Sequence, residues 1–444
     1  MSVNIRRNNI DGVIKAGLCI GCGTCVSICP TECIQIVEDN KSGMYIPKIN
    51  EEKCINCGLC LKVCPGLSVD FDLLNKQVFQ RIPIDELLGN YINCYIGYAT
   101  DYAIRYNSSS GGLVTALLCF MLEENIIDYA LVTLMDKENP LRPKVIIATT
   151  KEEIIAASGS KYCPVPLNAS LRKLLNSSGR SAIVGLPCHI HGIRKIETIN
   201  KGIEEKMYHF GLFCANLTSF LGTEYFLARY GIKKEDVISI RYRSEGWPGM
   251  ISVVTRSGVY KICRGPVEKN TLRRAIYYSA FHYDFIPYRC LVCPDQTNEL
   301  ADISFGDAWL PELLNKESAG FSIVISRTKK GQKILDRALR KGVIKLTKIN
   351  RSTLLRAGNF YFKASAGSRI NLSKYLGKPV PHFVKGNLRL QADIIDLIYF
   401  SQYFPSFFSK NRRIWSFLPA IALLRRCMST PLAIVISTRR RREK

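Results

Sequence analysis

The sequence is poor in histidine, in acidic side chains and in long apolar runs. It has five histidines in 444 residues, and 37 Asp and Glu residues against 62 Lys and Arg. So few histidines argue against zinc sites with mixed cysteine and histidine ligands. No run approaches the roughly 18 apolar residues of a membrane-spanning helix, and the first residues lack the apolar stretch of a secretory signal. We therefore expect a cytoplasmic protein with substantial cores, since 47% of the residues are hydrophobic.

Cysteine, by contrast, is abundant, with 18 residues. Disulfides belong to oxidising compartments, so many cysteines in a cytoplasmic chain indicate metal or redox chemistry. Residues 19–30 read CIGCGTCVSICP, and residues 54–65 read CINCGLCLKVCP. Both match C-x2-C-x2-C-x3-C-P, the run of bacterial two-cluster ferredoxins, whose fourth cysteine binds the sister cluster. A zinc module is the alternative, but two such runs in tandem, each with its proline, argue against it.

The spacing therefore predicts two [4Fe–4S] clusters in a ferredoxin-like α+β domain at residues 1–75. The ligands of the first cluster are Cys19, Cys22, Cys25 and Cys64, and those of the second are Cys54, Cys57, Cys60 and Cys29. Cys33 lies outside the pattern and is interpreted as a small core residue. Two adjacent clusters conduct electrons without catalysing a reaction, so we expect an electron acceptor further along the chain.

The rest of the chain alternates between strand-like and helix-like segments. The polar loop Ser108–Gly112 opens an apolar run long enough for a helix, and a strand is expected at Tyr129–Met135. A serine N-cap there would leave backbone N–H groups for an anion, although many ordinary helices begin in this way. A second strand is expected at Ala182–Val184, before a glycine–proline turn and another helix. The pattern predicts an α/β main body.

Four further cysteines follow these expected strands. Cys188 follows the strand at Ala182–Val184, Cys214 ends another strand-like stretch, and Cys290 and Cys293 form a C-x-x-C pair. Because α/β sheets place ligands at strand ends, these thiols are a candidate four-thiolate site. Each lone cysteine is by default a buried core residue, so the residues alone leave both interpretations open.

A compact polar and aromatic turn is expected downstream of the C-x-x-C pair, with a simple β-turn as the alternative. Its residues are Asp302, Gly306, Asp307 and Trp309.

Seven short motifs follow one another in the main body. They are SSSGG (108–112), SGSKY (158–162), GLPC (185–188), GLFC (211–214), YRSEGWPG (242–249), CLVC (290–293) and ADISFGDAW (301–309). In this order they resemble the beta-subunit family of coenzyme F420 hydrogenases and dehydrogenases, whose coenzyme is a deazaflavin. The resemblance covers roughly residues 85–345, and some members of the family also carry a fused two-cluster ferredoxin domain.

The resemblance implies an α/β fold that carries FAD and a third [4Fe–4S] cluster. It implies an FAD-site region at 85–185 and a region holding the third cluster at 186–350. The implied cluster ligands are Cys188, Cys214, Cys290 and Cys293. The implied flavin contacts are Ser108, Ser109, Ser110, Gly111, Gly112, Ser160, Lys161, Tyr162, Asp302, Gly306, Asp307 and Trp309.

Two residues are catalytic candidates within this resemblance. Lys161 would stabilise the anionic reduced flavin, while Tyr162 would stack on a ring and Ser109–Gly112 would hold pyrophosphate or the flavin edge. His189 stands where glutamine is commoner in the family, and is either a proton donor or a packing group.

The net charge of +25 favours polyanionic partners such as an acidic electron-donor protein or a phosphorylated cofactor. The basic extension at 351–444 ends in short apolar segments bracketed by arginines, and we expect it to be helical. It either lies on an anionic membrane surface, which would place the protein on the inner face of the membrane, or is a solvated or partner-docked helix.

The leading hypothesis is an iron–sulfur flavoenzyme. Electrons from a donor protein would pass through three [4Fe–4S] clusters to FAD, which would deliver hydride to a small organic acceptor. The acceptor would be the deazaflavin coenzyme or a substrate of surface-polysaccharide synthesis. The alternative is a non-catalytic electron-transfer subunit in a larger hydrogenase or dehydrogenase complex; the sequence leaves a homo-oligomer open. The ferredoxin spacings and the lack of a nucleic-acid motif argue against a zinc-containing nucleic-acid-binding protein.

Overall fold

The computed structural model describes residues 8–314, 318–358, 360, 363, 365–386 and 411–421. Most of the basic extension, including its terminal arginine clusters, lies outside these residues, so its helical form and membrane contact stay predictions. Within the described ranges, no helix combines the length and the apolar character needed to cross a bilayer. The described start of the terminal segment packs on the protein, because the Trp415 ring lies edge-on to Tyr225 at 5.7 Å.

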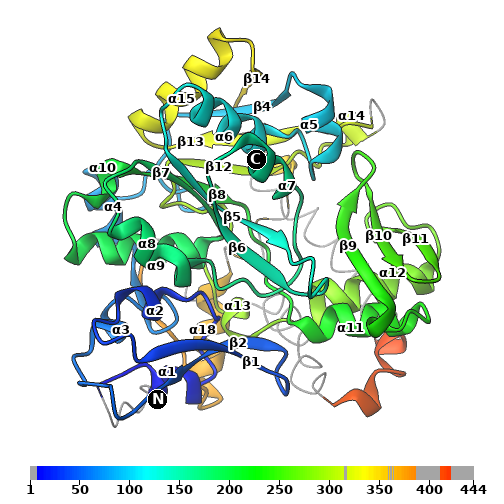
Figure 1. Cartoon of the computed structure of the whole chain (residues 1–444), viewed down its shortest axis with the longest axis horizontal. Coiled ribbons are helices and arrows are strands. Elements are labelled where there is room, and N and C mark those ends of the chain that lie inside the picture. Colours follow the sequence, from blue (N-terminus) through cyan, green and yellow to red (C-terminus); the bar gives the residue numbers. More distant parts are fainter. Residues whose placement is uncertain are drawn as a thin grey trace.

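An eight-stranded mixed sheet forms the centre of the molecule (Figure 1). Its strands, in spatial order, are β14 (Ile344–Ile349), β4 (Asn93–Ala99), β13 (Ser322–Ser326), β12 (Ile303–Asp307), β8 (Met207–Leu212), β7 (Ser181–Gly185), β5 (Tyr129–Met135) and β6 (Pro143–Ala148). The four inner strands β12, β8, β7 and β5 run parallel, and β6, β13 and β14 pair antiparallel. This confirms the predicted α/β body.

Both faces of the sheet are covered by helices. One face packs on α6 (Leu113–Glu123), α7 (Lys151–Ala156) and α15 (Lys329–Arg340), and the other packs on α4 (Phe71–Phe79), α8 (Leu171–Leu175) and α9 (Pro187–Ile199). The remaining short helices of this part are α5 (Tyr102–Asn107), η1 (Leu167–Ser170), α10 (Ile203–Lys206), α14 (Pro311–Leu314) and α16 (Arg351–Arg356). Parallel strands buried on both faces read as near-continuous apolar runs, as β5 and β7 do.

A smaller lobe stands beside the sheet, at the right of Figure 1. It contains the antiparallel strands β9 (Val237–Ser244), β10 (Met250–Thr255) and β11 (Gly258–Cys263), with helices α11 (Phe220–Arg229) and α12 (Thr271–Tyr278). These elements share a separate apolar core that includes Tyr225, Phe226 and Tyr242.

The N-terminal part lies below the sheet in Figure 1, coloured blue. It consists of α1 (Asp11–Lys15), α2 (Thr24–Ile28), β1 (Ile34–Asp39), β2 (Met44–Ile49) and α3 (Leu59–Lys62). Further segments join it to the body. They are β3 (Ser68–Asp70), α13 (Tyr288–Leu291) and α18 (Ala366–Tyr375). Strand β3 pairs with β15 (His382–Val384).

The N-terminal part docks tightly on the body through α2. Asn168 of η1 donates a side-chain hydrogen bond to Thr24 Oγ1 (2.9 Å), and its backbone N–H donates to the Cys22 carbonyl (2.9 Å). A Cβ added at Gly23 would lie 2.4 Å from the Ala169 nitrogen. Only glycine fits this approach, and its φ of 84° is also one that glycine adopts at little cost. The glycine of the first cysteine run therefore fixes that run against the body.

Two local expectations were right and two were wrong. The strand at Tyr129–Met135 is β5, and Ala182–Val184 lies within β7. The expected serine N-cap of α6 is wrong, because Gly112 caps that helix at φ 75° without a side-chain bond. The expected turn around Asp302 is also wrong, because residues 303–307 form a central strand.

Candidate functional site

The four cysteines predicted to bind the first cluster, the first quartet, converge on one cavity. Cys19, Cys22, Cys25 and Cys64 line it together with Pro65. Burial, and then the charges of the neighbouring thiols, raise the pKa of Cys25 well above its ordinary value. Burial likewise raises the pKa of Cys64 to about 11. Thiols placed so close in a buried site ionise only when positive charge accompanies them, which is what an iron cluster supplies.

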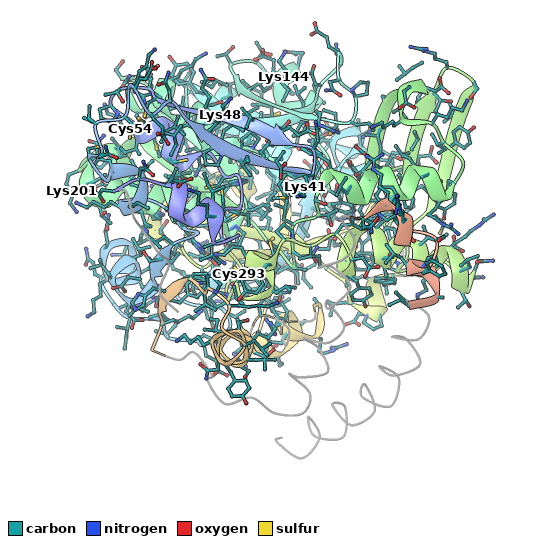
Figure 2. The ribbon with its side chains drawn as sticks, turned by 90° about the horizontal axis from the view of Figure 1, so that it is seen from below. Lys41, Lys48, Cys54, Lys144, Lys201 and Cys293 are labelled. Atoms are coloured by element: carbon teal, nitrogen blue, oxygen red, sulfur yellow. The ribbon has the colours of Figure 1, made fainter. Side chains whose placement is uncertain are left out.

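The four cysteines predicted to bind the second cluster, the second quartet, line a separate cavity. Cys29, Cys54, Cys57 and Cys60 surround it, and Cys33 joins them on the same wall. Cys57 is exposed and Cys54 half-buried. Figure 2 shows Cys54 toward the edge of the molecule and Cys293 nearer its middle. The second quartet is thus the one that faces solvent.

The third candidate quartet assembles at one edge of the sheet. Because β7 and β8 are parallel, Cys188, which follows β7, and Cys214, which follows β8, emerge on the same side. Cys290 on α13 and Cys293 close the group. After burial, the charges of Cys22, Cys214, Cys290 and Cys293 raise the pKa of Cys188 well above its ordinary value. The other three thiols are therefore close enough to Cys188 to affect its ionisation.

Two cations accompany this third quartet. Lys363 donates a hydrogen bond to the Cys290 carbonyl at 3.1 Å. Burial opposes ionisation of Cys293, but Lys363 and Arg289 lower its pKa below the ordinary value. Positive charge beside a four-thiolate cluster offsets its net negative charge, so this donor set suits an iron–sulfur cluster. Among the described residues, no three His, Cys, Asp or Glu side chains converge on a point that would hold a single metal ion.

The third quartet adjoins the first one. Cys188 is half-buried and packs against a buried cluster that contains Cys22, Ile20, Cys290 and Leu291. Among the neighbouring thiols, Cys22 has the largest electrostatic effect on the pKa of Cys188. The docking of α2 described above therefore places the first quartet beside the third, while the second quartet lies toward solvent.

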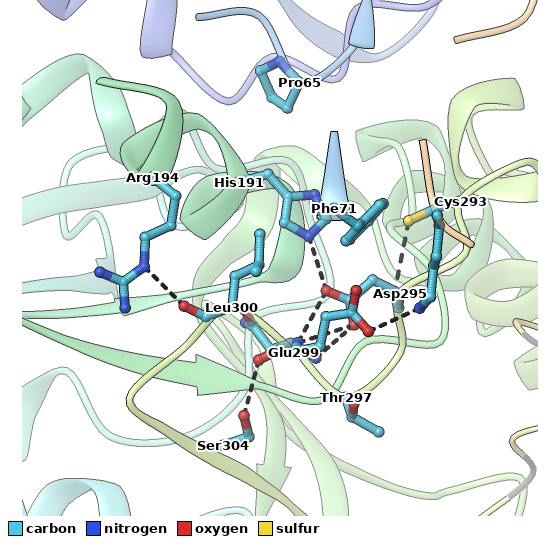
Figure 3. A network of polar contacts seen from close by, with 12 residues as sticks. Pro65, Phe71, His191, Arg194, Cys293, Asp295, Thr297, Glu299, Leu300 and Ser304 are labelled. Atoms are coloured by element: carbon cyan, nitrogen blue, oxygen red, sulfur yellow. Dashed lines mark hydrogen bonds and ion pairs between the residues drawn. The ribbon is translucent and has the colours of Figure 1, made fainter. Parts of the chain in front are cut away.

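A buried polar network holds the loop of the third quartet (Figure 3). His191 on α9 lies 2.8 Å from Asp295, measured from Nε2 to Oδ2, and both side chains are shielded from solvent. Asp295 also accepts hydrogen bonds from the backbone N–H groups of Asn298 and Glu299. Burial opposes the ionisation of Asp295, but the His191 hydrogen bond and nearby cations lower its pKa below the ordinary value. The network ties α9, which carries Cys188, to the chain just after Cys293.

The two serine- and glycine-containing loops meet at the same edge of the sheet. The Ser160 backbone N–H donates to Ser109 Oγ at 2.7 Å. Ser110 Oγ lies 2.7 Å from Ser322 Oγ, and the Gly111 N–H also bonds to that oxygen. Ser108 is buried and donates instead to the Ile104 carbonyl, within its own helix. The structure thus brings together the loops predicted to contact the flavin, but turns Ser108 away.

Lys161 and Tyr162 are both engaged inside the protein. The Lys161 ammonium donates to the carbonyls of Ala157, Ser158 and Gly159, and burial lowers its pKa to about 7. The Tyr162 ring packs against Tyr242 at 5.4 Å, so at least part of it belongs to the core of the lobe. Lys161 therefore changes charge near neutral pH.

His189 is placed as a packing group. Its Nδ1 accepts from the Leu186 N–H at 3.1 Å, and its Nε2 lies 3.0 Å from the Val165 carbonyl. Burial lowers its pKa to about 4, so the ring is neutral at physiological pH. With both nitrogens bonded to backbone, the ring holds the start of α9. The proton-donor role given to it as an alternative is not supported.

Asp302 lies at the other end of β12 from Asp307 and Trp309. It joins a buried network with His209 (2.9 Å), Lys330 (3.2 Å) and Arg194 (3.5 Å). Burial opposes its ionisation, but Lys330, Arg194 and the hydrogen bond with His209 hold its pKa well below the ordinary value. Five residues of strand span roughly 17 Å, so Asp302 does not share a site with Asp307. Its expected flavin contact is corrected to a structural ion network.

Two buried arginines face the remaining predicted residues. Arg243, at the end of β9, forms a 2.6 Å ion pair with Asp307. Arg264 donates to the hydroxyls of Tyr162 (3.0 Å) and Tyr277 (3.2 Å). Arg243 Nε and Nη2 and Arg264 Nε are buried without a hydrogen-bond partner. Unpaired buried guanidinium N–H groups are costly unless an anion meets them.

Aromatic rings complete this arginine-lined site. Trp309 packs on Trp247 with centroids 5.0 Å apart, and the Arg264 guanidinium lies over the Trp309 ring at 5.8 Å. The indole N–H of Trp247 is buried and unpaired. Gly306 is required at its position, because a Cβ there would lie 2.2 Å from the Phe213 ring. Arg243 and Trp247 belong to the motif at 242–249, but the sequence indicated no role for either residue. Arg264 lies outside every motif.

Three protein-family profiles match parts of this chain. Residues 94–172 match the profile "Coenzyme F420 hydrogenase/dehydrogenase, beta subunit N-term", and residues 179–352 match the corresponding C-terminal profile. Residues 18–66 match a 4Fe-4S dicluster domain.

Two relatives and one solved structure place these matches in context. The coenzyme F420 hydrogenase subunit beta of Methanothermobacter thermautotrophicus is 28% identical over 67% of this chain and all of its own length. The coenzyme F420-dependent sulfite reductase of Methanocaldococcus jannaschii is 24% identical over 79% of this chain and 51% of its own. A chain of the F420-reducing [NiFe] hydrogenase complex from Methanosarcina barkeri superposes with a TM-score of 0.53 at 25% identity, covering 67% of this chain and 98% of that chain.

Proposed function

Because the chain belongs to the coenzyme F420 hydrogenase/dehydrogenase beta subunit family and is an iron–sulfur oxidoreductase of that family, we propose that it reduces or oxidises an organic substrate at a flavin. The three cysteine quartets would hold [4Fe–4S] clusters, and the sheet edge beside the third would hold FAD. When bound, the clusters would carry single electrons, and the flavin would combine two of them into a hydride.

The single observation that carries this proposal is the order of the three quartets. The second quartet faces solvent at Cys57, and the first adjoins the third through Cys22 and Cys188. The third quartet lies at the sheet edge where β8 and β12 end, which is also the edge of the flavin candidates. A continuous series from the surface to the flavin site supports an electron path through the whole chain.

The residues of the sheet edge would bind and orient the flavin. Backbone N–H groups and hydroxyls of the loops at 109–112 and 158–160 would contact its polar edge. Lys161 would move from its loop carbonyls toward the reduced flavin, whose negative charge it would balance. Arg243 and Arg264 would hold a phosphate or carboxylate, because their unpaired N–H groups require an anionic partner.

The names of the relatives support the deazaflavin coenzyme as the acceptor or donor of hydride. An anionic deazaflavin derivative also suits the arginine-lined site. No feature of the described residues favours a substrate of polysaccharide synthesis over it. Because a structurally similar chain is part of a hydrogenase complex, we also propose a protein partner that exchanges electrons at the second quartet.

The surface next to Cys54 carries both signs of charge, because Glu51, Glu52 and Lys53 are all exposed there. The chain as a whole has a net charge of +25. That net charge would favour an acidic electron carrier of the ferredoxin type, whose association rate would fall as salt is added.

Anaerobic purification followed by assay of iron, sulfide and flavin tests the proposal. We expect about twelve irons per chain from three four-iron clusters, together with one FAD. Reduced protein should then reduce the deazaflavin coenzyme without any added subunit. A chain with iron but without flavin, or one that transfers no hydride, would contradict the enzyme and favour a non-catalytic electron-transfer subunit.

A further inference from the structure

The cavity of the second quartet is lined by five thiols. Cys33 lines it together with Cys29, Cys54, Cys57 and Cys60. Its Sγ lies 3.4 Å from the Sγ of Cys29. Cys33 is only 3% exposed, and its position was interpreted from sequence as part of the core. By comparison, the cavity of the first quartet has no fifth cysteine among its described lining residues.

The backbone fixes both sulfurs on one side of a tight turn. Cys29 ends α2, where its N–H bonds to the Val26 carbonyl. The turn closes when the Glu32 N–H donates to the Cys29 carbonyl, with Glu32 in the left-handed region at φ 51°. Cys33 is held at its other end by a 2.8 Å bond from the Asn50 N–H to its carbonyl. Neither thiol needs a backbone movement to face the cavity.

We propose that Cys33 is a reserve ligand for the second cluster, able to take the place of Cys29. The inference rests on the proposed cluster at this cavity. In the exchange, the iron–sulfur bond to Cys29 breaks and the released thiolate takes up a proton. The Cys33 thiol gives up a proton, and its sulfur bonds to the same iron, so no electron is gained or lost.

The position of this fifth thiol matches the exposure of the cavity. The second quartet is the solvent-facing one, since Cys57 is exposed and Cys54 half-buried. Accessible thiolate sites are the first to meet oxidants and competing ligands. A reserve sulfur 3.4 Å from the ligand at the buried side would keep the cluster attached while one bond is broken.

Alanine variants of the full chain, purified anaerobically, test the exchange. We expect Cys29→Ala to keep about twelve irons and Cys33→Ala to keep the same number. The double variant Cys29→Ala/Cys33→Ala should lose about four irons and the electron paramagnetic resonance signal of one cluster. Cys119→Ala, which removes a buried thiol of α6 far from the quartets, is the matched control and should match the wild type.

The outcomes separate this inference from the proposed function. If the wild type holds about twelve irons and Cys29→Ala only about eight, Cys33 is not a ligand, although the clusters stand. If the wild type itself lacks the second cluster, both the inference and the proposed function fail.

A second measurement avoids any loss of folding. Cys33→Ala keeps all four primary ligands, so we expect it to load fully but to release iron to a chelator faster than the wild type. Release at the wild-type rate would overturn the reserve role.

Discussion

At the scale of single residues, buried charges define the chemistry of the site. Lys161 and Arg243 lie at the same edge of the sheet, but they differ in what partners them. Lys161 is satisfied by loop carbonyls and has a pKa of about 7, whereas Arg243 has buried N–H groups without a hydrogen-bond partner. One residue therefore makes the site sensitive to pH, and the other makes it selective for anions.

The charge of Lys161 predicts a pH dependence. Because burial lowers its pKa to about 7, the ammonium is present below that pH and is lost as pH rises through it. Hydride transfer that needs this charge should slow as pH rises above about 7. In Lys161→Arg, whose side chain stays charged, the decline should be absent, and Lys161→Gln should be slow at every pH. A stopped-flow pH profile, scaled to bound flavin, measures this; an unchanged profile in Lys161→Arg would contradict the role.

Arg243 predicts a preference for an anionic ligand. Replacing it in Arg243→Gln removes a charged hydrogen-bond donor, which should cost about 1.5–3 kcal/mol, or roughly tenfold to hundredfold in Kd. Flavin content and the KM for the deazaflavin show which ligand carries the anion. Arg256→Gln, which changes an exposed arginine of the same lobe, is the control. Equal effects of the two substitutions would show that affinity falls because the net charge of the protein is reduced, not because a specific contact of Arg243 is lost.

At the scale of elements, α9 holds the third quartet against the body. Its first turn carries Cys188, and His191 ties it to Asp295 beyond Cys293.

His191→Ala leaves the buried Asp295 carboxylate short of a partner, which should cost about 1–3 kcal/mol of stability. We expect a lower melting temperature and a chain that has lost about four irons from the third quartet. His382→Ala, which changes an exposed histidine, should do neither. Full iron in His191→Ala would show that this tie does not position the quartet.

Elements also explain what could be predicted from the sequence. The two-cluster domain was predictable because its cysteines follow a local spacing, and a 4Fe-4S dicluster domain matches residues 18–66, while the assignment of single cysteines to clusters stays a prediction. The third quartet was suggested by strand ends, and the sheet places those strands side by side. Asp302 was predicted to lie with Asp307 at one turn. The two residues are close in sequence, but β12 places them at opposite ends of a strand.

The arginine-lined site could not be predicted, because it depends on tertiary packing. Arg243 and Arg264 lie in different parts of the lobe, and Asp307 comes from the main sheet. Nothing in their local sequence indicates that their side chains converge. The α/β body and the family could be predicted, because alternating segments and seven ordered motifs are properties of the chain itself.

At the scale of the whole molecule, the two-cluster N-terminal part is fixed to the α/β body so that the first and third quartets adjoin. The fixing contacts are short and specific, with Asn168 bonded to α2 and Gly23 against Ala169. A rigid junction keeps electron carriers at a constant separation, which loosely tethered domains would not. The central claim is that electrons reach the flavin only through the third quartet.

The most direct test follows flavin reduction in stopped flow with a reduced ferredoxin as donor. The wild type should show rapid flavin bleaching after the N-terminal clusters are reduced. Cys214→Ala, with flavin bound and about eight irons, should reduce its N-terminal clusters but leave its flavin oxidised. Flavin reduction in Cys214→Ala at the wild-type rate would contradict the account.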